Sequence, residues 1–312
     1  MERPAFEKLL AMAAKPAALE QTVGYVAACL RRFLKKREQV LICLPDSGTD
    51  SLGAIMEQAV LRAEGMPVFW KKDLRWKSLL KLAFSTRVTT VIAPPLIALG
   101  LAKLAKAADT PLYIRNVLVA GELCPEWIAD GVQWGLDCKV WCCYGVGSGG
   151  VVRGCSCDKS RGIHLRDDVY GGRILDGSGE PVPEGQNGEV VFYPLSDPAL
   201  PWNAGVQARL VTEPCSCGCA SPRLMDIAPG SNTDLELLRL EEHLRRWTSV
   251  LDCRLWRGPH GLEMEIVVFP GEKLPKLPSC AKQVVRPWEP DRDEPFEILP
   301  EWKNVGYSSD SH

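Results

Sequence analysis

Residues 140–164, VWCCYGVGSGGVVRGCSCDKSRGIH, mark the point where the pattern of this sequence changes. The apolar run at the start predicts a strand that ends near Tyr144 and Gly145. Several glycines follow, and then two cysteines and His164. The segments on either side of this stretch differ in pattern, and together they predict the fold.

The residues before this stretch alternate between strand and helix patterns. Continuous apolar runs predict buried strands, and apolar residues at helical spacing predict helices between them. This alternation is typical of an α/β fold with a mostly parallel sheet covered by helices. The predicted strands are 39–44, 66–70, 88–95, 115–121 and 138–145, and the predicted helices between them are 51–65, 96–108 and 124–135.

Short alternating segments rich in glycine and proline replace this pattern after Gly154. Residues 171–195 predict a β-hairpin with a glycine-rich turn. A helix at 235–247 and two strands after it predict a small α+β unit. The predicted domains are a large domain over 1–226 (an α/β part, 1–150, and a β-rich part, 151–226), a reduced C-terminal domain over 227–270, and a loosely packed or disordered tail over 271–312.

Composition narrows the class of protein. The 312 residues are 46% hydrophobic, which supports a packed core, and the net charge of −2 argues against nucleic acid as a partner. The chain has no apolar run of 18 residues and no good signal peptide, so we expect no membrane partner and a cytoplasmic location. Tryptophans in 69–76, with Trp247 and Trp256, could mark an interface with another protein or a second copy of the chain, or half-buried cover.

A glycine pattern in the opening stretch invites a dinucleotide-binding interpretation. Gly145, Gly147 and Gly150 satisfy G-x-G-x-x-G at the end of a strand. That site needs a helix directly after the glycines, so that its N-terminus faces the pyrophosphate. Residues 151–162 carry no amphipathic period and two further glycines, so the match is taken as coincidental.

Cysteine usage points to a metal instead. The chain has 13 cysteines, and disulfides are rare in a reducing compartment. Six residues separate Cys157 from His164, and Cys215 and Cys217 follow about fifty residues later. Thiolates and imidazole suit a structural zinc, which would clip two loops together. The alternatives are free thiols in polar loops, or Cys155 or Cys219 as a ligand in place of a neighbour.

Several segments, in order, resemble the phenylacetate–CoA ligase branch of the AMP-forming, adenylating enzymes. The resemblance covers roughly residues 15–270. Residues 179–195, GEPVPEGQNGEVVFYPL, and the cysteine segments are its most specific parts. The other matching segments are VAGELCPEW (119–127), YGVGS (144–148), CDKSRGIHLRDDVYGGRILD (157–176) and PCSCGCASPRLMD (214–226).

The resemblance implies two sites. Gly121, Glu122, Tyr144 and Gly145 match the positions that hold adenine, with the tyrosine stacked on the base. The Cys-x6-His and Cys-x-Cys pairs match zinc ligands, which here are Cys157, His164, Cys215 and Cys217. The cofactors implied are a structural zinc and, if activity is retained, ATP with Mg²⁺ and CoA. An acyl or aromatic carboxylate would be the substrate.

Residues of the adenylation chemistry depart from the family pattern. Residues 9–19, LLAMAAKPAAL, stand where a Ser/Thr/Gly-rich phosphate loop is expected, and we expect them to be helical. Ser148 replaces a Mg²⁺-associated glutamate, and Arg209 stands where an aspartate binds ribose. Ser231 replaces a hinge arginine. Lys282 is at best one register from the catalytic lysine, and sequence that would precede the phosphate loop is absent.

These departures favour a non-catalytic interpretation. We expect a zinc-stabilised scaffold or binding subunit, and we assign no catalytic residue. Losing one oxyanion-stabilising donor can cost about 2.7–4 kcal/mol, so losing several groups together should leave little adenylation. The alternative is an active AMP-forming acyl- or aryl-CoA ligase with cations recruited from Arg161, Arg166 and Arg173. A third interpretation gives Cys142 and Cys143 a thiol function, against a strand end that merely carries two small residues.

Overall fold

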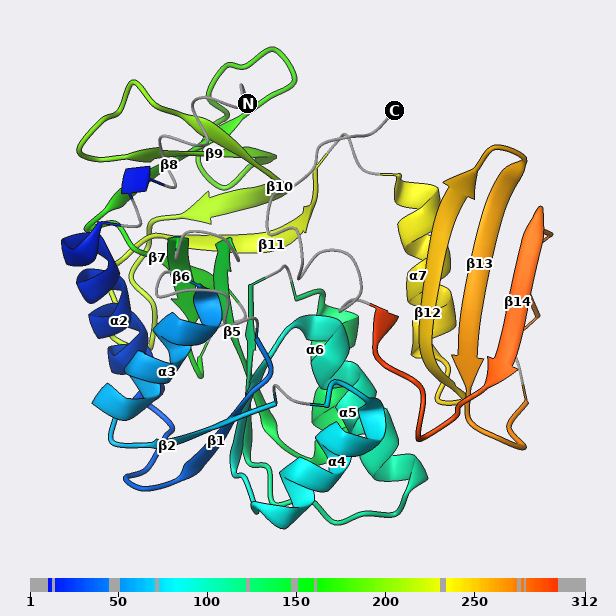
Figure 1. The fold of residues 1–312 in the computed structure, drawn as a ribbon. Helices are drawn as coiled ribbons and strands as arrows, with labels where there is room; N and C mark the ends of the chain where they lie inside the picture. Colours follow the sequence, from blue (N-terminus) through cyan, green and yellow to red (C-terminus); the bar gives the residue numbers. More distant parts are fainter. Residues whose placement is uncertain are drawn as a thin grey trace.

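One large sheet and one small sheet form the core of the molecule (Figure 1). Eleven strands make the large sheet, in the order β2-β1-β3-β4-β5-β6-β7-β11-β10-β9-β8, and three make the small one, in the order β12-β13-β14. The computed structural model describes residues 11–12, 15–44, 51–70, 73–121, 124–146, 151–159, 162–230, 234–273, 276–277 and 279–296.

The N-terminal half of the large sheet is parallel and carries helices on both faces. Alternate residues of β1 enter different cores: Val40 and Ile42 pack with α2 and α3, whereas Leu41 packs with α4 and α5. Figure 1 shows α2 and α3 on one side of these strands and α4 to α6 on the other. The elements are α2 (Pro16–Leu30), β1 (Gln39–Ile42), α3 (Leu52–Arg62), β2 (Met66–Phe69), α4 (Trp76–Ser85), β3 (Thr90–Ala93), α5 (Pro95–Ala107), β4 (Asn116–Ala120), α6 (Glu126–Leu136) and β5 (Lys139–Val146).

From β5 onward the sheet is antiparallel, in the part of the chain that was expected to be β-rich, whereas the parallel strands expected over 1–150 are β1 to β5. The β-rich part continues the same sheet. No described helix lies between Lys139 and Pro229. Parallel neighbours need a long crossover, usually helical, whereas antiparallel neighbours can be joined by short turns. The strands are β6 (Val151–Ser156), β7 (Ile163–Leu165), β8 (Tyr170–Leu175), β9 (Asn187–Pro194), β10 (Trp202–Val211) and β11 (Arg223–Pro229), and the hairpin expected over 171–195 is β8 and β9.

The small sheet packs against α7 and against the helices α4 and α5. Leu251, Val267 and Phe269 belong to the same apolar cluster as α4 and α5. The ammonium of Lys103 on α5 also donates to three carbonyl oxygens near the end of α7. The elements are α7 (Leu235–Arg246), β12 (Val250–Gly258), β13 (Gly261–Val268) and β14 (Lys282–Pro287).

The structure differs from the expected loose tail. Residues 282–287 form β14, which pairs in parallel with β13, and Asp293 and Phe296 are buried. Val284, Val285 and Phe296 supply the strand propensity and apolar surface that a proline-rich, charged composition conceals. Residues 297–312 lie outside the described residues.

Two tryptophans considered as interface residues are core residues instead. Trp70 and Trp76 are buried against α4 and α5, whereas Trp247 is exposed. The helix α4, which begins at Trp76, was not predicted from the sequence. In the described part of the chain, no helix is long and apolar enough to cross a membrane.

Candidate metal centre and nucleotide site

Strand pairing brings Cys157 and His164 close to the loop that carries the other cysteines. β7 lies between β6 and β11, with His164 opposite Cys155 on one side and opposite Arg223 on the other. Cys157 directly follows β6. β11 pairs with β7 on one side and with β10 on the other. The loop that joins β10 to β11 is therefore held near β7.

A tight turn in that loop points two sulfurs toward His164. The amide of Gly218 donates to the Cys215 carbonyl at 2.9 Å, and the amide of Cys215 donates to the Cys219 carbonyl at 3.1 Å. Gly218 has a φ of 87°, a left-handed conformation that glycine adopts without strain. The C-S-C-G-C sequence (215–219) is therefore a turn that directs its first two sulfurs, those of Cys215 and Cys217, toward one point.

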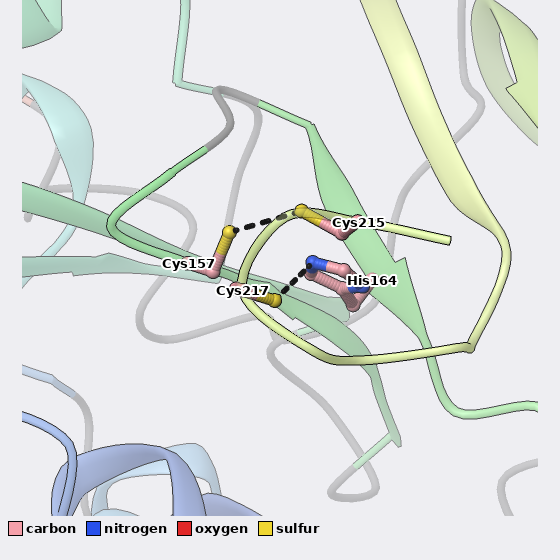
Figure 2. Close-up of side chains that lie close together, drawn as sticks. All are labelled: Cys157, His164, Cys215 and Cys217. Atoms are coloured by element: carbon pink, nitrogen blue, oxygen red, sulfur yellow. Dashed lines mark hydrogen bonds between the residues drawn. The ribbon is translucent and has the colours of Figure 1, made fainter. Parts of the chain in front are cut away.

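The four predicted ligands lie together (Figure 2). One nitrogen or sulfur atom from each of Cys157, His164, Cys215 and Cys217 lies within 4.8 Å of all the others. The Sγ atoms of Cys157 and Cys215 are 3.8 Å apart, and Cys217 Sγ is 3.5 Å from His164 Nε2. With Zn–S bonds of about 2.3 Å and Zn–N bonds of about 2.0–2.1 Å, a tetrahedral zinc spaces two sulfurs about 3.8 Å apart and sulfur and nitrogen about 3.5 Å apart.

The protonation states of these side chains also suit a cation. Desolvation by burial lowers the pKa of His164 below its usual value, which favours the neutral imidazole. The backbone N–H of Cys217 lowers the pKa of the Cys215 thiol, which favours the thiolate. A metal ligand must present a lone pair, so both shifts favour binding.

Neither spare cysteine belongs to this cluster among the described residues. Cys155 is buried in the core beside α2, where its backbone N–H donates to the Tyr25 hydroxyl at 3.1 Å. Cys219 contributes its carbonyl oxygen to the turn, but its sulfur is not part of the cluster. Cys143 is a buried core residue, as the structural interpretation of this strand end expected.

The residues expected to hold adenine meet at the carboxyl ends of two parallel strands. Ala120 on β4 pairs with Cys143 on β5, so Gly121 and Tyr144 follow side by side. Gly121 has a φ of 98°, and Gly145 continues β5. Glu122 and Ser148 lie outside the described residues.

The side chain of Tyr144, near the carboxyl end of β5, is covered by other parts of the protein. Its side chain is only 8% exposed, and burial raises the pKa of its hydroxyl. The guanidinium of Arg153 lies 5.8 Å from the Tyr144 ring centroid, 5.2 Å from that of Phe192 and 4.6 Å from that of Trp202. An arginine packed among aromatic rings gains cation–π attraction while losing water.

Sequence reasoning missed Arg153, because one charged residue in an alternating strand is usually a solvated one. Its inward direction is evident only in the folded chain, where Arg153 on β6 contacts aromatic rings carried by β9 and β10. Arg209, the residue at the expected ribose position, forms an ion pair with Asp226 across the β10–β11 ladder. Ser231 and Arg161 lie outside the described residues.

Comparison with known proteins gives the same fold. No family model matches the chain. A segment of 136 residues, 41% of the chain, is 30% identical to the phenylacetate-coenzyme A ligase of Thermus thermophilus, of which it covers 30%. A 2-hydroxyisobutyryl-CoA ligase in the postadenylation state superimposes with a TM-score of 0.64 over 81% of the chain, at 16% identity. The chain has the fold of the AMP-forming CoA ligases.

This CoA ligase fold is shared with a benzoate CoA ligase from Burkholderia xenovorans LB400, at a TM-score of 0.56 and 13% identity over 85% of the chain. The chain spans 59% of the 2-hydroxyisobutyryl-CoA ligase and 62% of the benzoate CoA ligase. The CoA ligase fold therefore covers most of this chain, whereas the chain covers only part of each relative.

Proposed function

We propose that this chain is a zinc-stabilised, non-catalytic scaffold or binding subunit built on the CoA ligase fold. Zinc would be held by Cys157, His164, Cys215 and Cys217. The support is the spacing of their sulfur and nitrogen atoms, which matches a tetrahedral site. Four protein ligands leave no open position, so this zinc would stabilise the loops and not activate water.

The covered ring of Tyr144 carries the non-catalytic part of the proposal. A residue that stacks on adenine has to present a ring face to the base. Here the ring is nearly buried, with the Arg153 cation over it. Opening that face would require moving a fully buried guanidinium away from the rings of Phe192 and Trp202 as well.

The position expected for ribose supports the same proposal. A guanidinium has no acceptor atom, so Arg209 cannot accept hydrogen bonds from ribose hydroxyls. Its partner is already Asp226 on the neighbouring strand. A nucleotide would have to break this pair and would gain no acceptor from Arg209.

The phosphate and lysine positions lack the expected groups too. Pro16 begins α2, so the described residues of the expected phosphate loop from Lys15 to Leu19 lead into and form a helix. Lys282 lies in β14, beside Glu263 of β13, and is exposed. Pro16 has no N–H, and the amides of Ala18 and Leu19 donate to the Lys15 carbonyl, so this turn offers few free amides to a phosphate.

The retained partner would be a carboxylic acid, another protein or a second copy of this chain. The relatives with this fold are named for 2-hydroxyisobutyryl and benzoate thioesters, which makes an acyl or aromatic carboxylate the natural small-molecule candidate. ATP, Mg²⁺ and CoA would be cofactors only if adenylation survives. The cytoplasm remains the predicted location.

Two measurements on the purified chain test the proposal. The first is pyrophosphate release from ATP and Mg²⁺ in the presence of benzoate or phenylacetate, with and without CoA. The second is calorimetric titration with adenosine, which reports the adenine pocket without any phosphate contact. We expect no acid-dependent pyrophosphate and no heat from adenosine, in protein that contains about one zinc per chain.

Acid-dependent pyrophosphate release would overturn the non-catalytic proposal and leave the active ligase in its place. Folded protein that contains no zinc after purification without chelator would overturn the structural role of the metal.

A further inference from the structure

A hollow of about 560 Å³ lies at the amino ends of β4 and β5, the opposite end from Tyr144. Gly121 lies five residue steps after Asn116, which lines this hollow, and five steps correspond to about 16 Å along a strand. We call it the basic cleft. Its lining residues are Arg32, Phe33, Lys35, Glu38, Arg115, Asn116, Lys139, Trp141, Asp158 and Cys217.

The basic cleft carries more positive than negative charge. Four of its lining residues are arginine or lysine and two are carboxylates, which leaves an excess of two positive charges. One carboxylate, Glu38, is already paired with Arg115. Among the described residues, Lys35 and Lys139 form no ion pair, and both are exposed.

Arg32 connects the cleft to the metal centre. Arg32 and Cys217 line the same cleft, so this guanidinium shares the cleft with one of the proposed metal ligands. With zinc bound, three thiolates and one divalent cation would leave one negative charge on the cluster, which Arg32 offsets. Asp158 pairs with Lys159, which does not line the cleft, at 3.3 Å, so Lys35 and Lys139 are the cations that remain to compensate a ligand.

Two side-chain contacts order the wall of the cleft. The rings of Phe33 and Trp141 stack at 4.6 Å with an interplanar angle of 21°. The Trp141 indole N–H donates to the buried Asn116 side chain at 3.2 Å. Because these contacts are made inside the protein, a ligand would meet positioned cations and an aromatic edge without first ordering the wall.

We propose that the basic cleft binds a small molecule through a phosphate monoester. A phosphate monoester carries a charge near −2 at pH 7, which matches the charge excess, whereas a carboxylate carries only one. Three terminal phosphate oxygens can accept from several donors, and arginine and lysine are the side chains that bind phosphate. The proposal does not rest on the non-catalytic function, because the cleft is separate from the candidate nucleotide site.

Calorimetric titration with inorganic phosphate, phenyl phosphate and benzoate tests the proposal. Phenyl phosphate and benzoate carry the same ring and differ in the anion. We expect both phosphates to bind, benzoate to bind at least tenfold more weakly, and affinity to fall as salt rises. Tighter binding of phenyl phosphate than of inorganic phosphate would indicate an aromatic monoester as the ligand, and equal binding would indicate phosphate itself.

Two variants locate the binding. In the double variant Lys35→Met and Lys139→Met, phosphate affinity should fall about tenfold or more, since hydrogen bonds to charged groups are the strong ones. Lys36→Met is the matched control: Lys36 is exposed, pairs with Glu64 and does not line the cleft. Its affinity for phosphate should stay within about twofold of the parent chain.

Three outcomes would overturn the proposal: no binding of either phosphate, unchanged affinity in the double variant, or an equal loss in the Lys36→Met control. None of these bears on pyrophosphate release or on adenosine, so failure here is distinguishable from failure of the proposed function.

Discussion

At the scale of single residues, two cysteines of the 214–219 turn belong to the four-atom cluster and the third, Cys219, does not. Replacing Cys215 with serine removes one sulfur from the four-atom cluster. A hydroxyl is a much poorer zinc ligand than a thiolate. We expect Cys215→Ser to lose most of its zinc on dialysis against a chelator, under conditions in which the parent chain keeps about one zinc, as measured by elemental analysis.

Cys219→Ser is the control for this prediction. Cys219 lies in the same turn but outside the cluster, so this variant should keep its zinc. Equal loss of zinc from both variants would mean that the turn and not the sulfur ligand holds the metal.

Lys103 gives a prediction on pH. Its Nζ donates to the carbonyl oxygens of Arg245, Trp247 and Val250 at 2.6, 3.1 and 2.6 Å. Burial, and then the charge of Arg245, lower the pKa of Lys103 to about 7. A neutral amine has only two N–H donors for these three acceptors, so the hydrogen bonds act against this shift.

The sign of the pH effect follows from the lowered pKa. Between pH 7 and 10.5 the unfolded chain keeps the proton that the folded chain has lost, so stability rises with pH in this window, and the full cost of the buried charge is present below pH 7. Relative to Lys103→Met, the parent chain should gain up to about 1.4 kcal/mol per pH unit between pH 7 and 9 in urea unfolding. A flat difference would show that the three carbonyls hold the proton.

At the scale of elements, α5 depends on a glycine where a helix would usually prefer alanine. A Cβ built on Gly100 would lie 2.1 Å from the ring of Trp76, the first residue of α4. Trp76 is fully buried and cannot move outward. The close approach of α4 to α5 therefore requires that residue 100 has no side chain.

Gly100→Ala should lower the free energy of unfolding by about 1–3 kcal/mol, the usual cost of overpacking a core. Gly24→Ala in α2 is the matched control, because its nearest neighbour is an Arg62 side-chain atom at 3.5 Å. That substitution should stabilise the chain by about 0.5–1 kcal/mol through helix propensity alone. Urea unfolding measures both, and a stabilising Gly100→Ala would contradict the packing of α4 on α5.

At the scale of the whole molecule, one face of the small sheet joins the apolar cluster on the α4 and α5 side of the large sheet, and its other face packs in a separate cluster with α7. Leu251, Val267 and Phe296 pack in the same cluster as α4 and α5. Asp252 on β12 also accepts the backbone N–H of Phe296 at 2.9 Å. The predicted boundary between residues 226 and 227 falls within β11, so it cuts a strand of the large sheet and does not separate the two sheets.

Phe296→Ala should lower the free energy of unfolding by about 3–5 kcal/mol, because it empties a buried aromatic site. Val284→Ala on β14, whose side chain is 39% exposed, should cost less than about 1 kcal/mol. Thermal unfolding followed at two wavelengths should also show one transition for the parent chain. A small effect of Phe296→Ala would mean that the segment after β14 contributes little to the core.

The sequence by itself determined the parallel strands, most of the covering helices, the β8–β9 hairpin and the four side chains that cluster as candidate metal ligands. Those features leave a local signal: apolar period, glycine-rich turns, and cysteine and histidine spacing that only a few chemistries use. The inward direction of Arg153, the pairing of Arg209 with Asp226 and the burial of Trp76 have no such signal. Each depends on which strands and helices become neighbours. An arginine or tryptophan gives the same sequence signal whether its neighbours in the folded chain bury it or leave it exposed. Tertiary structure alone decided these contacts, because they join residues that are far apart in the chain.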